Sequence, residues 1–107
     1  NNKIELVEED IAITDNFKQE YIIKEYIVSS LRIDNVISAI TNNSRNQVLD
    51  KFLNKEILLN YEEDIKPTRT LRENDIFSIR KYGKYKFSKI IKTTKKGGLI
   101  IEVLQYK

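Results

Sequence analysis

The first pattern of apolar and polar positions that predicts an element lies in residues 21–28 (YIIKEYIV). β-Branched and aromatic side chains dominate this segment, and in a strand Ile23 and Ile27 would share one face, opposite Val28. We therefore expect a strand, although the spacing of Phe17, Tyr21 and Val28 would also suit a helix.

Two amphipathic helices are predicted next. Residues 31–41 place apolar side chains at i, i+3, i+4 and i+7, which is one helical stripe: Ile33, Val36, Ile37 and Ile40. Ser44 and Gln47 have the spacing of a capping box, so a second helix should begin at Ser44 and end near Asn54. Its expected core face consists of Val48, Leu49, Phe52 and Leu53. Because only a short polar break separates them, the two helices should form an αα-hairpin.

From residue 57 onward the apolar period changes to two, which predicts short antiparallel strands. The strands are expected at 57–59, 76–80, 84–92 and 99–106, with the Gly-containing segment 93–98 (TTKKGG) as the last turn. In the third of them, one face should carry Tyr85, Phe87 and Ile91, and the other Lys84, Lys86 and Lys92. The predicted fold class is α+β: a two-helix hairpin packed on a small antiparallel sheet, with a C-terminal β-hairpin.

Charge divides the 107 residues unevenly. Residues 1–30 carry three basic and seven acidic side chains, a balance of −4, whereas residues 31–107 carry sixteen basic and nine acidic ones, a balance of +7. We interpret residues 1–28 as an acidic leader, the tail of a preceding domain, and residues 81–107 as a basic C-terminal β-hairpin. The basic part suggests a polyanionic partner, although basic surfaces also serve solubility alone.

Composition limits the chemistry that the chain can perform. Without Cys or His there is no thiol nucleophile, imidazole base or common zinc site, and the sequence has no Gly-rich phosphate loop. We interpret two acidic clusters as solvated surface charge and not as metal sites: Glu8-Glu9-Asp10 and Glu62-Glu63-Asp64. We therefore expect no enzyme, no cofactor and no bound metal. The absence of a long apolar stretch or signal peptide predicts a cytoplasmic protein without a membrane span.

The sharpest functional signal is Ser44-Arg45-Asn46 at the start of the second predicted helix. Free backbone N–H groups and the helix dipole favour an anion there, and a guanidinium adds phosphate contacts. The alternative is a capping Ser followed by a solvated Arg. Arg32, before the first helix, is equally ambiguous, because it could pair with Asp34 or with a strand carboxylate.

At this level of detail the chain resembles the S-four RNA-binding domain, named after small-subunit ribosomal protein four. The resemblance covers about residues 29–107 and rests on these segments in order: Leu31-Arg32-Ile33-Asp34, Ser44-Arg45, Ile57-Leu58-Leu59-Asn60, Pro67-Thr68, Leu71 and Asn74-Asp75-Ile76-Phe77-Ser78-Ile79-Arg80. The continuation Lys81–Phe87 and Thr94–Gly97 is most similar to the C-terminal part of YlmH-type ribosome-associated proteins. Three turns depart from the pattern: Asn54-Lys55 stands where it has Gly, Asn74-Asp75 where it has Gly-Asp, and Asn60-Tyr61 where it has Asn-Gly or Asn-Trp.

The resemblance implies an alpha-L RNA-binding motif in residues 29–80, docking on structured RNA. The expected partners are ribosomal RNA and tRNA, in the context of the large ribosomal subunit and rescue of stalled translation, and the chain is expected to be a monomer. The residues expected to contact RNA are Arg32, Ser44, Arg45, Asn46, Lys51, Asn60, Lys66, Arg69, Arg80, Lys84 and Lys86. Arg32, Arg45, Lys51 and Arg69 should frame one surface, and Arg80, Lys84 and Lys86 should extend it along the later strands. Two alternatives stay open: a targeting domain of an RNA-modifying enzyme such as a pseudouridine synthase, and a basic protein-interaction module.

Overall fold

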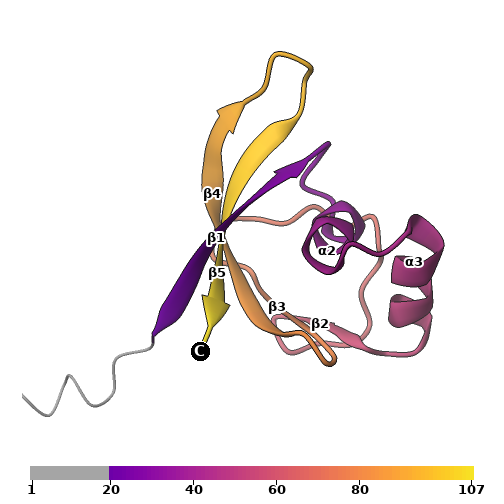
Figure 1. Cartoon of the computed structure of the whole chain (residues 1–107). Coiled ribbons are helices and arrows are strands. Elements are labelled where there is room, and N and C mark those ends of the chain that lie inside the picture. Colours follow the sequence, from indigo (N-terminus) through magenta and orange to yellow (C-terminus); the bar gives the residue numbers. More distant parts are fainter. Residues whose placement is uncertain (1–19) are drawn as a thin grey trace, which may run out of the picture.

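The computed structural model describes residues 20–107, which fold as two helices and five strands (Figure 1). Along the chain these elements are β1 (Tyr21–Val28), α2 (Ile33–Thr41), α3 (Arg45–Leu53), β2 (Ile57–Leu59), β3 (Ile76–Ile79), β4 (Gly83–Thr93) and β5 (Leu99–Tyr106). The α+β class and the order of elements predicted from the sequence are confirmed. Residues 1–19, including the Glu8-Glu9-Asp10 cluster and most of the predicted leader, lie outside the described residues.

The five strands form one antiparallel sheet in the order β1-β5-β4-β3-β2. The first strand pairs with the last over its whole length, from Tyr21 opposite Tyr106 to Val28 opposite Leu99. The predicted C-terminal hairpin is confirmed as β4 and β5, closed by a turn in which the Thr94 N–H donates to the Gly98 carbonyl at 2.8 Å. The sheet runs continuously across the divisions at residues 28 and 80 that charge and motif suggested.

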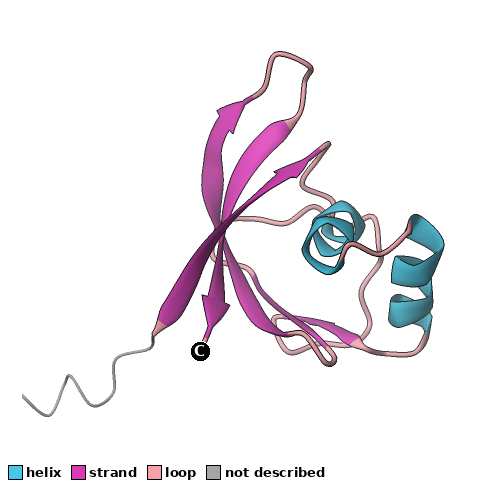
Figure 2. Ribbon diagram, viewed as in Figure 1, coloured by secondary structure: helices cyan, strands magenta, loops and turns pink. Residues whose placement is uncertain are grey.

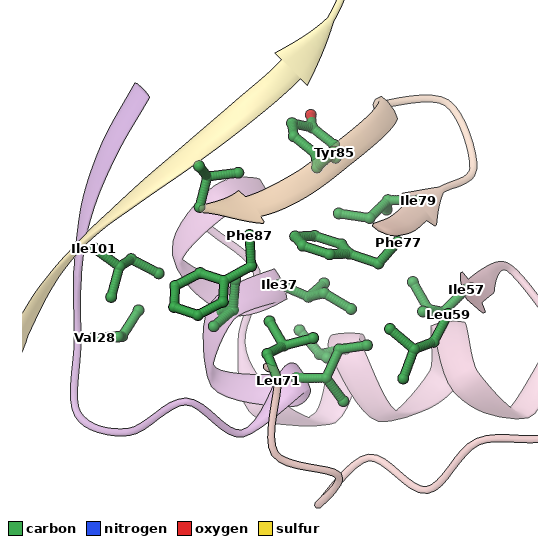
Figure 3. Packing of buried hydrophobic residues seen from close by; sticks show 14 residues of the cluster. Val28, Ile37, Ile57, Leu59, Leu71, Phe77, Ile79, Tyr85, Phe87 and Ile101 are labelled. Atoms are coloured by element: carbon green, nitrogen blue, oxygen red, sulfur yellow. The ribbon is translucent and has the colours of Figure 1, made fainter. Parts of the chain in front are cut away.

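Both helices lie on one side of the sheet (Figure 2). Helix α2 contributes Ile33, Val36 and Ile37 to the core, all fully buried, as its apolar stripe predicted. Figure 3 shows Ile37 pointing toward Phe77, Phe87 and Leu71. These residues join the inward faces of the strands in one hydrophobic core, which includes Val28, Ile57, Leu59, Ile79, Tyr85, Ile101 and Val103.

Helix α3 buries a narrower stripe than its sequence predicted. Val48 is fully buried and Phe52 packs against the core, but Leu53 is 78% exposed. The prediction that Leu53 belongs to the core is therefore wrong. It fails because α3 lies at the rim of the fold, where only one side of the helix is covered and the next position around it faces water.

Two irregularities in the β4–β5 pairing change which side chains of β4 face the core. The register shifts between Phe87 and Lys89 and again between Ile90 and Lys92. Each β-bulge adds an unpaired residue, so strict alternation is lost. Tyr85 and Phe87 are buried as predicted, but Ile91 is 41% exposed, and its predicted place on the buried face is wrong.

The side of the sheet opposite the helices carries no described helix (Figure 2). Because side chains alternate along a strand, the residues between the buried ones point to this outer face. On β4 they include Lys84 and Lys86, which flank the buried Tyr85, and on β1 and β5 they include Tyr21 and its register partner Tyr106. Within residues 20–107, neither helix is long and apolar enough to span a membrane.

Left-handed backbone conformations occur at all three turns where the sequence departs from the S-four pattern. Lys55, Tyr61 and Asn74 have φ values of 60°, 70° and 74°. Glycine adopts this region without strain, whereas residues with a Cβ adopt it rarely. After α3 it is Lys55, and not Asn54 (φ −87°), that takes the left-handed conformation.

Candidate RNA-binding surface

The capped N-terminus of α3 carries an exposed cationic side chain, Arg45. The predicted capping box is confirmed: the Ser44 hydroxyl accepts from the Gln47 N–H at 3.2 Å, and the Gln47 side chain accepts from the Ser44 N–H at 2.8 Å. Arg45 and Asn46 follow it and are exposed. Within residues 20–107, Arg45 has no ion pair and no side-chain hydrogen bond. Its guanidinium is therefore available to an external anion beside the positive end of the helix dipole.

Arg32 has a partner within the chain. Its guanidinium donates two hydrogen bonds to the carboxylate of Asp34, from Nε to Oδ1 at 3.2 Å and from Nη2 to Oδ2 at 2.7 Å. This hydrogen bonding raises the pKa of Arg32, and the negative charge of Asp34 adds to the effect. Asp34 is buried in the first turn of α2, and the Arg32 guanidinium compensates the cost of burying its negative charge. Of the two partners that the sequence left open, Asp34 is the one found.

Arg69 and Asn60 are also engaged, around the buried carboxylate of Asp75. The Asn60 amide donates to Asp75 at 3.1 Å, and the Arg72 N–H donates to it at 2.8 Å. The Arg69 guanidinium is 3.6 Å from the same carboxylate. The other end of Asn60 accepts from the Ile76 N–H at 3.0 Å. These contacts tie the turn after β2 to the start of β3, which is a structural use of two predicted RNA-contacting residues.

Replacing Asp75 with asparagine should lower the free energy of unfolding by about 1 kcal/mol. An amide has one accepting oxygen in place of two, so the Asn60 amide or the Arg72 N–H loses its acceptor, and Arg69 loses its ion pair. Urea denaturation of the variant and the parent chain measures the difference. Asp50→Asn, at an exposed position of α3, is the matched control and should change stability by less than about 0.5 kcal/mol. Equal effects of the two substitutions would contradict the structural role of Asp75.

The remaining cations near the helices differ in their exposure and in their acidic neighbours. The Lys51 ammonium is 3.9 Å from Glu56 and 5.3 Å from the ring centroid of Tyr82, so the side chain lies against the β3–β4 turn. Arg80, in that turn, is exposed and has no ion pair among residues 20–107. Lys66 is exposed, but it lines a pocket together with the carboxylates of Glu62 and Asp64.

No protein family model matches this chain, and no curated protein is significantly similar to it. The residues themselves therefore carry the functional argument. Within residues 20–107, no three His, Cys, Asp or Glu side chains are placed to hold a metal ion together.

Lys84 and Lys86 lie on the outer face of the sheet, among three tyrosines. The Lys84 ammonium is 4.4 Å from the ring centroid of Tyr106 and 5.1 Å from that of Tyr61, and the Lys86 ammonium is 6.0 Å from that of Tyr21. We call these five residues the tyrosine–lysine cluster. A hydrogen bond with Tyr61 raises the pKa of Lys84.

Lys84 and Lys86, which were expected to extend the surface of the helix cations along the later strands, lie on the opposite face of the sheet. Side-chain alternation on β4 points them away from the side where the helices lie. The tyrosines of this cluster were missed by the sequence interpretation. The alternation of Lys84 and Lys86 with buried aromatic residues was a signal for this second face, but the strand order that brings Tyr21 and Tyr106 beside it was not visible in the sequence.

Proposed function

We propose that residues 29–107 form an RNA-binding domain of the S-four type that docks on structured RNA. The observation that carries the proposal is Arg45, exposed and without an acidic partner among residues 20–107, in the first turn of a helix capped by Ser44. A phosphate placed there would meet free backbone N–H groups, the positive end of the helix dipole and a guanidinium.

The left-handed turns support the assignment to this family. The S-four pattern has glycine at or beside three positions where this chain has other residues, and these are the turns in which Lys55, Tyr61 and Asn74 adopt positive φ. The backbone thus keeps the conformation that glycine allows although the residue types differ. The sequence departures therefore do not count against the resemblance.

The two-helix hairpin packed on an antiparallel sheet is compatible with an alpha-L RNA-binding motif, which is the finer part of the proposal. By the same resemblance to YlmH-type proteins, the RNA would be ribosomal RNA or tRNA at the large ribosomal subunit, during rescue of stalled translation in the cytoplasm. The excess of basic side chains from residue 31 onward suits such a partner.

A salt titration tests whether the chain binds RNA through its phosphates. Fluorescence anisotropy with a labelled, folded tRNA transcript should show affinity that falls steeply as KCl rises, because each neutralised phosphate releases counterions. Sequence preference should be modest, because folded RNA is recognised mainly by shape and backbone.

Heparin is the control for unspecific charge attraction. If the site is built for folded RNA, unlabelled tRNA should compete for the chain at lower concentrations of negative charge than heparin does. Equal competition by the two polyanions would contradict the proposal and favour a basic protein-interaction module.

A further inference from the structure

Aromatic and cationic side chains meet at one end of the outer sheet face, in the tyrosine–lysine cluster. The rings of Tyr21 and Tyr106 pack edge to face with centroids 5.0 Å apart, and Lys84 lies between Tyr106 and Tyr61. Burial raises the pKa of Tyr106, and the neighbouring Tyr21 hydroxyl adds to the effect. Tyr61 is the most open ring of the three, with 66% of its surface exposed.

Tyr61 reaches this place through a strained backbone. Asn60 and Tyr61 both have positive φ, 50° and 70°, and the Leu59 and Glu62 backbones exchange hydrogen bonds of 2.9 and 3.0 Å around them. This is a two-residue hairpin turn of the type whose second position is usually glycine. A tyrosine there is sterically unfavourable and leaves a large apolar ring in water, and such outliers are a reason to look for a function.

A groove of about 680 Å³ adjoins the cluster and shares Lys84 with it. Leu58 and Ser78 form part of its lining, and both point to the outer face because their strand neighbours are buried. Arg80 and Lys81 line it too. The groove therefore continues the cluster toward the β3–β4 turn.

The charges of this part of the face favour an anion. Four basic side chains line the groove, namely Lys55, Arg80, Lys81 and Lys84, against two carboxylates, Glu56 and Glu63. One of the two, Glu56, is 3.9 Å from the Lys51 ammonium. On the outer face of the paired strands, Glu102 lies opposite Lys89, nearer the other end of β4. A chain that combines negative charge with flat rings matches this surface better than an acidic peptide, which offers charge alone.

We propose that the tyrosine–lysine cluster binds unpaired RNA nucleotides, with a base stacked on Tyr61 and phosphates along Lys84, Lys86 and Arg80. Single-stranded nucleic acids are bound in this way by basic grooves with aromatic platforms. The inference rests on the proposed RNA-binding function and adds a second face, opposite the helices, for nucleotides that leave the folded part of the RNA.

The test compares two fluorescent probes on the 107-residue chain: an oligouridylate of about ten nucleotides and a fully paired RNA hairpin closed by a short loop. Tyr61→Gly removes the ring and relieves the backbone strain, so the variant should fold. We expect it to weaken oligouridylate binding about fivefold, near the lower end for loss of one stacked base. Tyr61→Phe keeps the ring and should stay within about twofold of the parent chain.

Leu53→Ala is the control, because Leu53 is also a large exposed apolar side chain but lies on α3, outside both the cluster and the groove. It should leave oligouridylate binding within about twofold, and all three variants should bind the hairpin as the parent chain does. The parent chain could also bind oligouridylate in a Tyr61-dependent way and not bind the hairpin. That result would contradict the docking proposal and support this inference.

Two outcomes would overturn the inference. One is oligouridylate binding that does not change in Tyr61→Gly. The other is no binding of oligouridylate by the parent chain, which would leave a protein as the occupant of this face. With hairpin binding intact, either outcome leaves the proposed function standing.

Discussion

Replacing Arg45 with glutamate is expected to weaken binding to folded RNA at least about tenfold, which corresponds to about 1.4 kcal/mol. The substitution puts a carboxylate where the start of α3 and the guanidinium would meet a phosphate. Stability should not fall, because Arg45 is exposed and makes no ion pair within residues 20–107, and an acidic side chain in the first turn is favourable to the helix dipole. Anisotropy with tRNA and a thermal melt of each protein measure the two quantities.

Lys95→Glu is the control for net charge in this experiment. Lys95 is exposed in the β4–β5 turn, and the substitution changes the charge of the chain by the same amount as Arg45→Glu. A localised site predicts a clearly smaller loss of affinity for Lys95→Glu. If the two variants lose affinity equally, the contact at α3 is wrong and binding comes from a diffuse basic field.

Replacing Ile37 with alanine should lower the free energy of unfolding by about 2–5 kcal/mol. Ile37 is fully buried between α2 and the sheet, where Figure 3 shows it among Phe77, Phe87 and Leu71, so the substitution removes buried apolar contacts and leaves a cavity. Urea denaturation monitored by circular dichroism gives the difference.

Leu53→Ala is the matched control, since it also shortens an aliphatic side chain on a helix. Leu53 is 78% exposed, so its truncation should change stability by less than about 0.5 kcal/mol. The sequence pattern alone predicts a large loss at both positions, and the structure predicts it only at Ile37. Losses below about 0.5 kcal/mol at both would contradict the packing of α2 on the sheet.

Local sequence determined the elements of this fold. The capping box of Ser44 and Gln47 needs only residues within one helical turn, and the stripe of Ile33, Val36 and Ile37 needs only the helical period. The last hairpin follows from the Gly-containing turn, in which Gly97 has a φ of 87°. Short-range sterics and hydrogen bonds fix these features, so they were readable without any knowledge of distant residues.

Some failures of the sequence prediction arise where packing overrides a local period. Leu53 continues the apolar pattern of α3, but no neighbouring element covers it. Ile91 continues the alternation of β4, but one register shift against β5 precedes it and a second falls at Ile91 itself, so the alternation is broken. In both cases the sequence pattern predicts the direction in which a side chain points. Whether that side chain is buried depends on the neighbouring element that packs against it.

The candidate RNA-binding surface was only partly determined by the sequence. The identity and exposure of Arg45 at a helix start follow from residues next to it. The sequence does not show which cations stay unpaired. Arg69 pairs with Asp75, which also accepts a hydrogen bond from Asn60, and both contacts depend on how the connection between β2 and β3 folds back on itself. Ion pairing depends on positions in space. Lysines and arginines that look alike in the sequence therefore differ in the fold in whether an acidic partner neutralises them.

The tyrosine–lysine cluster was decided by tertiary structure alone. Tyr21, Tyr61 and Tyr106 are separated by about forty residues each. The β1–β5 and β5–β4 pairings bring Tyr21 and Tyr106 beside Lys84 and Lys86, and the β4–β3 and β3–β2 pairings bring Tyr61 there from the other side. The sequence by itself determined the helices, the strands and the cationic start of α3, because each depends on contacts within a few residues. The order of strands in the sheet, and with it the second face, depends on pairing between the two ends of the chain, which no local period encodes.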